Sequence, residues 1–373
     1  MEGRKRVKRE AHPFGKSWYI GSYSNIPVKV HWSFGLLLLF IVYTILTNEM
    51  KMWQAIAYTM LVFAVFACVI MHEYGHALTG QKFGVKTVDI IITPIGGLAR
   101  MNRIPDHPAQ EFLITLAGPM VNLIIAIVIG FLFYIVTGKF SLDMTTYNLN
   151  HPTEFIRLLV PINLTLFLFN LIPAFPMDGG RILRSLLAVK FGKVRATRIA
   201  TQIGKLLAIG FIIFGIFDQQ IILALIGLFI FMMANQEYDQ TKLLSIIGHT
   251  TVSELMQTSF TRLHLGDTYQ SLIEKYQNGE RNFLVFDSIG NLSGTVPELF
   301  IKDFIDQEKD PTLTVNQQMS SKTRIIDPAM LLKDAIDTMR DDGLAILAIG
   351  DENNIIGVLD RNTIEKYLRS KAG

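Results

Sequence analysis

The 373-residue sequence contains a single cysteine, Cys68. One cysteine excludes an intramolecular disulfide framework and a zinc site built from several cysteines, so any metal ion would have to be held by histidine and carboxylate side chains. The net charge of +3 is small for this length and gives no argument for a nucleic-acid partner. The sequence therefore predicts neither a disulfide-rich domain nor a nucleic-acid-binding protein.

Long apolar segments that contain few charged residues follow one another before about residue 234. Half of all residues are hydrophobic and the mean hydropathy is +0.34, which is too apolar for an average soluble enzyme. The last apolar segment is short for a bilayer about 30 Å thick. We nevertheless predict about six transmembrane helices, at residues 32–48, 53–79, 110–137, 154–177, 199–217 and 220–234. From Asn235 onward charged residues recur every few positions, as in a soluble domain.

Positive charges are distributed unevenly between the connecting loops. Arginines and lysines cluster before the first apolar segment, after the second and after the fourth, whereas the opposite loops carry little more than Lys51 and Lys139. By the positive-inside rule both termini are cytosolic, and the lack of a small-residue cleavage site indicates an uncleaved N-terminus. The predicted parts are a basic cytosolic segment (1–30), a transmembrane domain (31–235), a linker (236–248) and two repeats (249–311 and 312–373).

The second apolar segment ends in the sequence HEYGH, residues 72–76. Four helical steps rotate a side chain by only about 40°, so His72 and His76 share one face of a helix and can hold one metal ion. Zinc lowers the pKa of a bound water toward about 7, and the adjacent carboxylate of Glu73 can take its proton. The pattern predicts a zinc site that activates water against a peptide carbonyl. Cys68 lies one turn earlier on the same face, and we interpret it as a buried apolar side chain.

A catalytic zinc ion needs a third protein ligand, and Asp178 is the best candidate. It lies in the sequence NLIPAFPMDGGR (170–181), whose prolines and glycines break the fourth apolar segment. The alternative is an ordinary helix-capping aspartate at the start of the following amphipathic segment. Depth favours the ligand: from Trp53 to His72 is roughly 28 Å of helix, and from Phe155 to Asp178 roughly 35 Å, so both reach the cytosolic third of the bilayer.

Two further features could lie beside this site. Residues 85–101 are apolar but interrupted by Pro94 and two glycines, which predicts an extended hairpin at the membrane surface. Its open edge could pair with an extended peptide, and the alternative is a surface loop with no role in substrate binding. Asn122, in the sequence GPMVN of the third segment, either lines the site or joins neighbouring helices by hydrogen bonds.

Taken together, HEYGH, GPMVN and NLIPAFPMDGGR resemble the motifs of the site-2 protease family of intramembrane zinc metalloproteases, in its six-span bacterial and archaeal branch. The resemblance covers about residues 15–235. It implies one zinc ion held by His72, His76 and Asp178, with Glu73 as the general base. It also implies that Asn122 and Asn170 lie near the substrate path. The predicted hairpin adds Gly96 and Gly97 as residues that could bind substrate or line the active site. Family members cleave a membrane-embedded helix of a protein substrate, which implies a multi-pass plasma-membrane protein and leaves a regulatory membrane partner open.

From His249 onward the sequence repeats itself with an offset of 63 residues, so that the segment starting at Thr251 overlays the one starting at Thr314. Each unit predicts a short strand, a helix, two strands joined by a turn, and a closing helix. Two such units resemble a tandem CBS-domain pair, which implies dimerisation, substrate docking or regulation by an adenine nucleotide. The family's ribose-binding turn, Gly-x-x-Thr/Ser-x-x-Asp, is not matched after Gly294 or Gly357, so nucleotide binding stays open.

The sequence thus predicts a polytopic α-helical membrane protein with a membrane-surface β-hairpin, followed by a soluble α/β tandem CBS domain. The function it predicts is intramembrane zinc-dependent proteolysis. One alternative is a CBS-regulated membrane transporter, which would need polar residues along the spans, whereas here they cluster at one level. The other is an inactive protease-like scaffold, against which the complete set of His, Glu, His and Asp argues.

Overall fold

The computed structural model describes residues 17–102, 105, 107–138, 152–307, 309–352 and 354–372. The chain separates into two compact units, Met1–Tyr238 and Asp239–Gly373. The basic residues that begin the predicted N-terminal segment lie outside the described residues.

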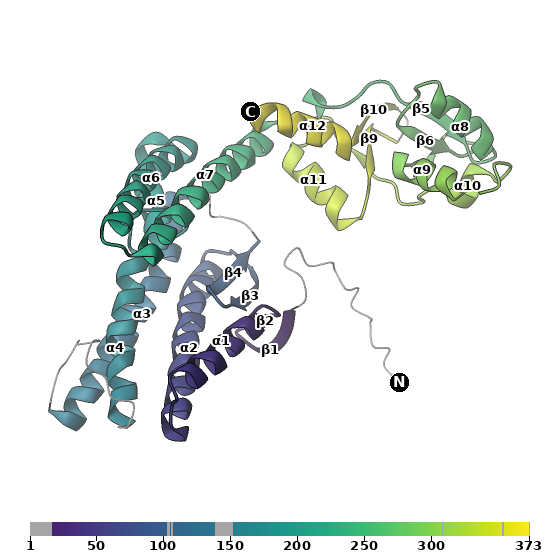
Figure 1. Ribbon diagram of the computed structural model, residues 1–373. Helices are drawn as coiled ribbons and strands as arrows, with labels where there is room; N and C mark the ends of the chain where they lie inside the picture. Colours follow the sequence, from purple (N-terminus) through teal and green to yellow (C-terminus); the bar gives the residue numbers. More distant parts are fainter. Residues whose placement is uncertain are drawn as a thin grey trace. The chain divides into compact units, whose positions relative to one another are not determined.

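The first unit combines one small sheet with long helices (Figure 1). Its elements are β1 (Ser17–Tyr23), β2 (Ile26–His31), α1 (Phe34–Thr47), α2 (Met52–Lys82), β3 (Thr87–Thr93), β4 (Gly96–Met101), α3 (Pro108–Thr137), α4 (Pro152–Asn170), α5 (Asp178–Phe191), α6 (Lys193–Phe217) and α7 (Ile221–His249), of which α7 belongs to this unit as far as Tyr238.

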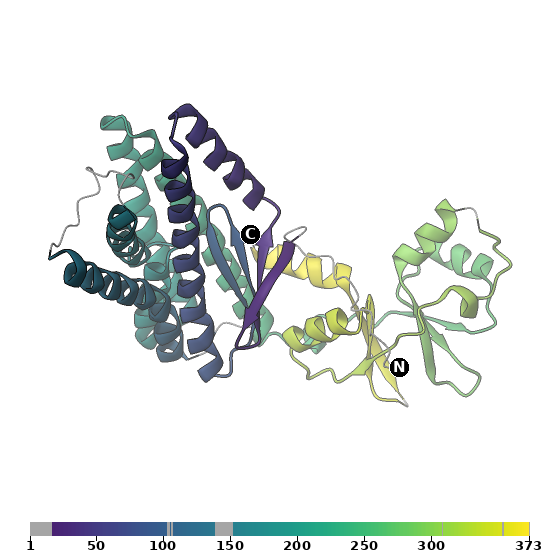
Figure 2. The same ribbon diagram turned by 90° about the horizontal axis from the view of Figure 1, so that it is seen from below.

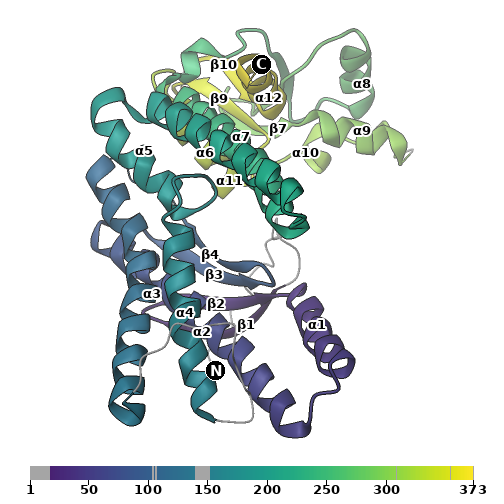
Figure 3. The same ribbon diagram turned by 60° about the vertical axis from the view of Figure 1, so that its left-hand side comes forward.

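The sheet has four strands in the order β1-β2-β3-β4 (Figure 3). The predicted hairpin is confirmed, because β3 and β4 pair antiparallel and the pairing closes at Thr93 and Gly96. Residues 17–31 are not a separate segment, since β1 and β2 extend the same sheet and Val28 pairs with Ile90 of β3. Ile26 and Val28 alternate with less buried residues and pack with β3 on helix α2. The strand β4 is left as one edge.

Four helices among the described residues are long and apolar enough to cross a membrane: α2, α3, α6 and α7. Helix α1 and the apolar part of α4, Ile156–Asn170, are shorter, so the count of six crossings stays a prediction. The expectation that the last segment is the short one is wrong. No glycine or proline interrupts residues 228–247, so α7 continues through the predicted linker as far as His249.

The second unit consists of two sheets with their helices (Figure 2). Its elements are η1 (Val252–Glu254), β5 (Thr261–His264), α8 (Tyr269–Gln277), β6 (Phe283–Phe286), β7 (Leu292–Val296), α9 (Glu298–Asp306), α10 (Val315–Gln318), β8 (Ile325–Ile326), α11 (Leu332–Asp341), β9 (Ile346–Gly350), β10 (Ile355–Asp360) and α12 (Arg361–Ala372). The central strands β6 and β9 each pair parallel on one side and antiparallel on the other. The predicted order of elements in each repeat is confirmed.

The two repeats exchange their first segments. Val252, which begins the first repeat, is fully buried in the core of the second, and Val315 is fully buried in the core of the first. Backbone hydrogen bonds fix both exchanges, from Val252 N to Met330 O at 2.9 Å and from Val315 N to Asp267 O at 2.8 Å. Neither core is complete without a segment of the other repeat.

Candidate metal centre

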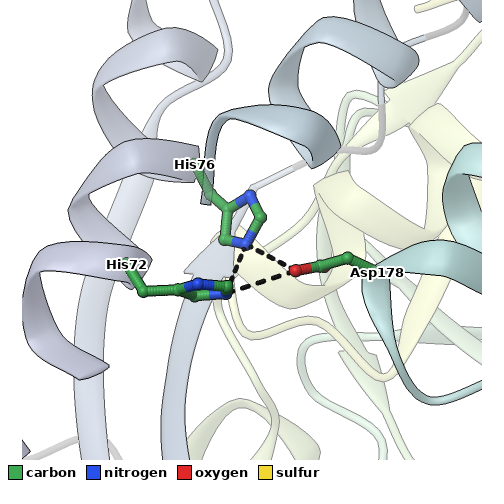
Figure 4. A group of neighbouring side chains, drawn as sticks. All are labelled: His72, His76 and Asp178. Atoms are coloured by element: carbon green, nitrogen blue, oxygen red, sulfur yellow. Dashed lines mark hydrogen bonds and ion pairs between the residues drawn. The ribbon is translucent and has the colours of Figure 1, made fainter. Parts of the chain in front are cut away.

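Three side chains from two elements meet at one point in the first unit (Figure 4). His72 and His76 lie on one face of α2, and Asp178 is the first residue of α5. The two Nε2 atoms are 3.1 Å apart, and each lies 3.2 Å from Oδ2 of Asp178. Both histidines are buried and the aspartate is nearly so. The structure therefore brings together the three residues for which the sequence predicts a metal.

The loop that delivers Asp178 is held by close backbone packing. Ala174 and Phe175 are buried, and the loop folds back onto the first turn of α5. A Cβ atom at Gly179 would overlap the carbonyl of Ile172, and one at Gly180 would lie 2.7 Å from the carbonyl carbon of Ala174. The two glycines of the DGG sequence are therefore needed for this approach, which fixes where the aspartate lies.

The far nitrogens of both imidazoles have their own partners. Nδ1 of His76 is 2.8 Å from the carbonyl oxygen of Ile114, and because a carbonyl only accepts, Nδ1 donates and Nε2 keeps its lone pair. Nδ1 of His72 is 3.2 Å from the amide nitrogen of Asn122, whose buried oxygen has no partner among the described residues. Turning that amide over would let its oxygen accept from Nδ1, which would leave Nε2 of His72 free in the same way.

These atoms fit a zinc ion. Two nitrogen lone pairs and a carboxylate oxygen face one another, and Oδ2 of Asp178 is buried without a hydrogen bond from any described residue. Ligands at zinc distances of about 2.0–2.1 Å in tetrahedral geometry are about 3.3 Å apart, close to the separations found here. A Cβ atom at Gly118 would run into both imidazoles, so the missing side chain leaves room beside the three donors.

Glu73 lies on α2 next to His72 and contacts the edge strand β4. Its Oε2 accepts a hydrogen bond of 2.8 Å from the backbone N–H of Ala99. Gly97 packs against the same side chain, because a Cβ atom there would lie 2.6 Å from Cγ of Glu73. The strand thus holds the carboxylate in place while leaving it further lone pairs with which to accept a proton.

Three other residues singled out from the sequence show other contacts. Gly96 begins β4 directly after the turn, with a φ of 143° and no atom of a described residue within 4 Å of its missing Cβ. Asn170 ends α4 and donates to the carbonyl of Leu166. Cys68 is buried and lies 3.4 Å from the amide nitrogen of Asn163, outside the three-residue group.

Comparisons with known proteins agree with this geometry. Residues 60–211 match the model of peptidase family M50, and residues 315–370 match that of the CBS domain. Residues 60–211 therefore form a peptidase M50 domain, the domain of the site-2 protease family. Four long apolar helices accompany this domain, as expected of a membrane protein.

Relatives from several organisms resemble this chain. The zinc metalloprotease MJ0392 of Methanocaldococcus jannaschii is 38% identical over 62% of this chain and 63% of its own length. The putative zinc metalloprotease Rip3 of Mycobacterium tuberculosis is 26% identical over 79% of this chain and 77% of its own length. The solved site-2 protease of Methanocaldococcus jannaschii is 39% identical over 60% of this chain and 95% of that one, with a TM-score of 0.43. The match to MJ0392 thus spans less than two thirds of that relative.

One buried ionic cluster of the M50 unit was not found from the sequence. Arg184 of α5 contacts Glu111 of α3 and Glu237 of α7. A signal was present, because Glu111 and Glu237 stand next to apolar helical segments, where ionisable residues are rare and usually paired. Nothing in the spacing of these residues indicated that they would meet.

Proposed function

We propose that this chain is an intramembrane zinc-dependent endopeptidase that hydrolyses a peptide bond within or near the transmembrane segment of a membrane-protein substrate. The observation that carries the proposal is the convergence of Nε2 of His72, Nε2 of His76 and Oδ2 of Asp178 within 3.2 Å of one another, on helices of a membrane unit. These three residues would hold one zinc ion.

Each nearby residue has a role in this reaction. Zinc bound there would supply a Lewis acid that polarises the scissile carbonyl and makes water nucleophilic near neutral pH. Glu73 accepts the proton of the attacking water and passes it to the departing amide nitrogen, as a general base and then a general acid. Ile114 and Asn122 orient the two imidazoles through their Nδ1 atoms.

The edge strand β4 offers a place for the substrate backbone. One side of β4 pairs with β3, and the N–H of Ala99 on its other side points to Glu73. A helical segment keeps its carbonyls in the backbone hydrogen bonds, so a substrate must unwind before it can be attacked. An extended substrate strand added beside β4 would be held open next to the general base.

The remaining parts follow from the same proposal. Six crossings with both termini in the cytosol of a plasma membrane would place the CBS pair in the cytosol. The pair would dock the substrate, regulate the protease or form a homodimer, and adenine nucleotide binding stays open. Thr363 lies in the stretch that follows Gly357 of the second repeat. Its hydroxyl accepts a hydrogen bond of 2.7 Å from Gln257 and so already has a partner within the protein.

Zinc content and cleavage of single-span reporter proteins in liposomes test the proposal. We expect one zinc ion per wild-type chain, which is lost in His72→Ala and Asp178→Ala. Glu73→Gln should keep the zinc and lose about 100-fold or more in cleavage rate, the usual contribution of a general base. Glu352→Gln, at an exposed position, is the matched control. Full cleavage by Glu73→Gln would remove Glu73 as the base, and zinc retained by Asp178→Ala would return that residue to a capping role.

A further inference from the structure

The guanidinium of Arg184 is buried between two carboxylates. Its side chain is only 1% exposed, and Nε and Nη2 both donate to Oε1 of Glu111, the Nε contact measuring 2.8 Å. On the other side, Nη1 donates to Oε1 of Glu237 at 2.6 Å. Burying a charge is costly unless it is paired and hydrogen-bonded, and here all three ends of the guanidinium are occupied.

The cluster joins three helices that are far apart in the sequence. Glu111 lies in the first turn of α3, Arg184 in the middle of α5, and Glu237 in α7. A planar guanidinium with donors on two sides can bridge two carboxylates at a fixed angle, which an ammonium group cannot do. The cluster therefore fixes how α3 and α5 lie against each other.

Arg184 contacts Glu111 and Phe175, and each of these residues lies near one part of the candidate metal centre. Glu111 stands one turn before Ile114, whose carbonyl holds Nδ1 of His76. Arg184 lies over the ring of Phe175, 5.3 Å from its centroid, and Phe175 is buried in the loop that delivers Asp178. One side chain thus connects the backbone that orients a histidine to the loop that orients the aspartate.

Helix α7 supports the same loop. Phe175 packs in a small core with Ala200 of α6 and Ala234 of α7, and Ala234 stands one turn before Glu237. The hydroxyl of Thr201 donates to the carbonyl of Ala234, which fixes α6 against α7 at this level. The ring of Phe175 is therefore held from both sides, by the cluster and by the two helices.

We propose that Arg184 is a positioning residue for the metal centre. Through Glu111 and Phe175 it sets the separation between the support of His76 and the carboxylate of Asp178, and so keeps the three donors at the spacing that zinc requires. The inference rests on the proposed function, because it presupposes zinc at these donors. A purely structural Arg184 would stabilise the fold and leave the zinc affinity of folded molecules unchanged.

The test measures zinc loss to a chelator from detergent-solubilised, monodisperse full-length protein, together with reporter cleavage. Partners that orient metal ligands typically contribute 10–100-fold to metal affinity, so we expect Arg184→Met to lose zinc about 10-fold faster or more. Arg184→Lys should lie between this variant and wild type, because lysine keeps the charge but cannot bridge both carboxylates. Arg198→Met, the same substitution at an exposed position of α6, is the matched control and should release zinc like wild type.

Arg184→Met leaves a buried carboxylate unpaired and could fail to fold, so Arg184→Met/Glu111→Gln, which also removes the charge of Glu111, is measured beside it. Fast zinc release from every one of these variants that folds supports the inference. Wild-type zinc release from a folded variant overturns it and leaves Arg184 with a structural role only. A wild-type protein that holds no zinc would instead overturn the proposed function, so the two failures are distinguishable.

Discussion

At the scale of single residues, the candidate metal centre depends on the absence of a side chain at Gly118. A Cβ atom at Gly118 of α3 would overlap both imidazoles of α2. We therefore expect Gly118→Ala to push His72 and His76 apart and to lose zinc, although alanine by itself favours a helix by about 1 kcal/mol over glycine. Zinc stoichiometry of the purified variant measures the effect.

Gly210→Ala in α6 is the control for this substitution, because no atom of a described residue lies within 4 Å of its missing Cβ. It makes the same change in helix propensity and should keep one zinc ion. A Gly118→Ala protein with a full zinc complement would show that α3 does not approach the imidazoles this closely.

At the scale of elements, β4 is placed so that its backbone contacts Glu73, the proposed general base. Gly97→Ala would put a Cβ atom 2.6 Å from Cγ of Glu73 and force that side chain away from the N–H of Ala99. Neither Gly97 nor Glu73 is one of the three proposed metal ligands, so we expect zinc to stay bound. Cleavage should fall about 10-fold or more, because a well-placed general base contributes about 10²–10⁴-fold. Reporter cleavage and zinc content, measured on one preparation, separate the two effects.

Gly21→Ala in β1 serves as the control, because that glycine has open space on the same sheet. It should leave cleavage unchanged. Cleavage by Gly97→Ala at the wild-type rate would mean that β4 does not set the position of Glu73 during the reaction.

At the scale of the whole molecule, the exchanged segments make the second unit a single cooperative folding unit. Leu263 is fully buried in the core of the first repeat, so Leu263→Ala should cost about 2–5 kcal/mol. Because Val252 and Val315 cross between the cores, we expect faster hydrogen exchange in both repeats, including residues 346–360 of the second. Hydrogen exchange of the full-length chain, read by mass spectrometry, measures this.

Leu299→Ala, at an exposed position of α9, is the comparison for this variant and should change neither repeat. Faster exchange confined to residues 261–306 in Leu263→Ala would contradict the shared cores and indicate two repeats that unfold independently.

Sequence patterns were sufficient where the interaction is local. Helical spacing alone puts His72 and His76 on one face, alternation and turn residues predict β3 and β4, and the offset of 63 residues predicts the paired strands of the second unit. Sequence patterns were insufficient to place the ends of helices and to predict which distant residues contact each other. The sequence placed the boundary of α7 near residue 236, because the gain in charge there resembles a linker, yet the helix continues to His249.

What the sequence determined by itself is therefore the set of candidate site residues, two histidines, a glutamate and an aspartate in an apolar domain, and the duplicated α/β unit that follows. Only the tertiary structure decided which atoms face one another. Three contacts join segments whose sequence patterns are unrelated. They are the pairing of β2 with β3, the contact of β4 with Glu73, and the ion pairs of Arg184 with Glu111 and Glu237. Such contacts depend on packing and on pairing of buried charge, which fix distances that spacing along the chain does not encode.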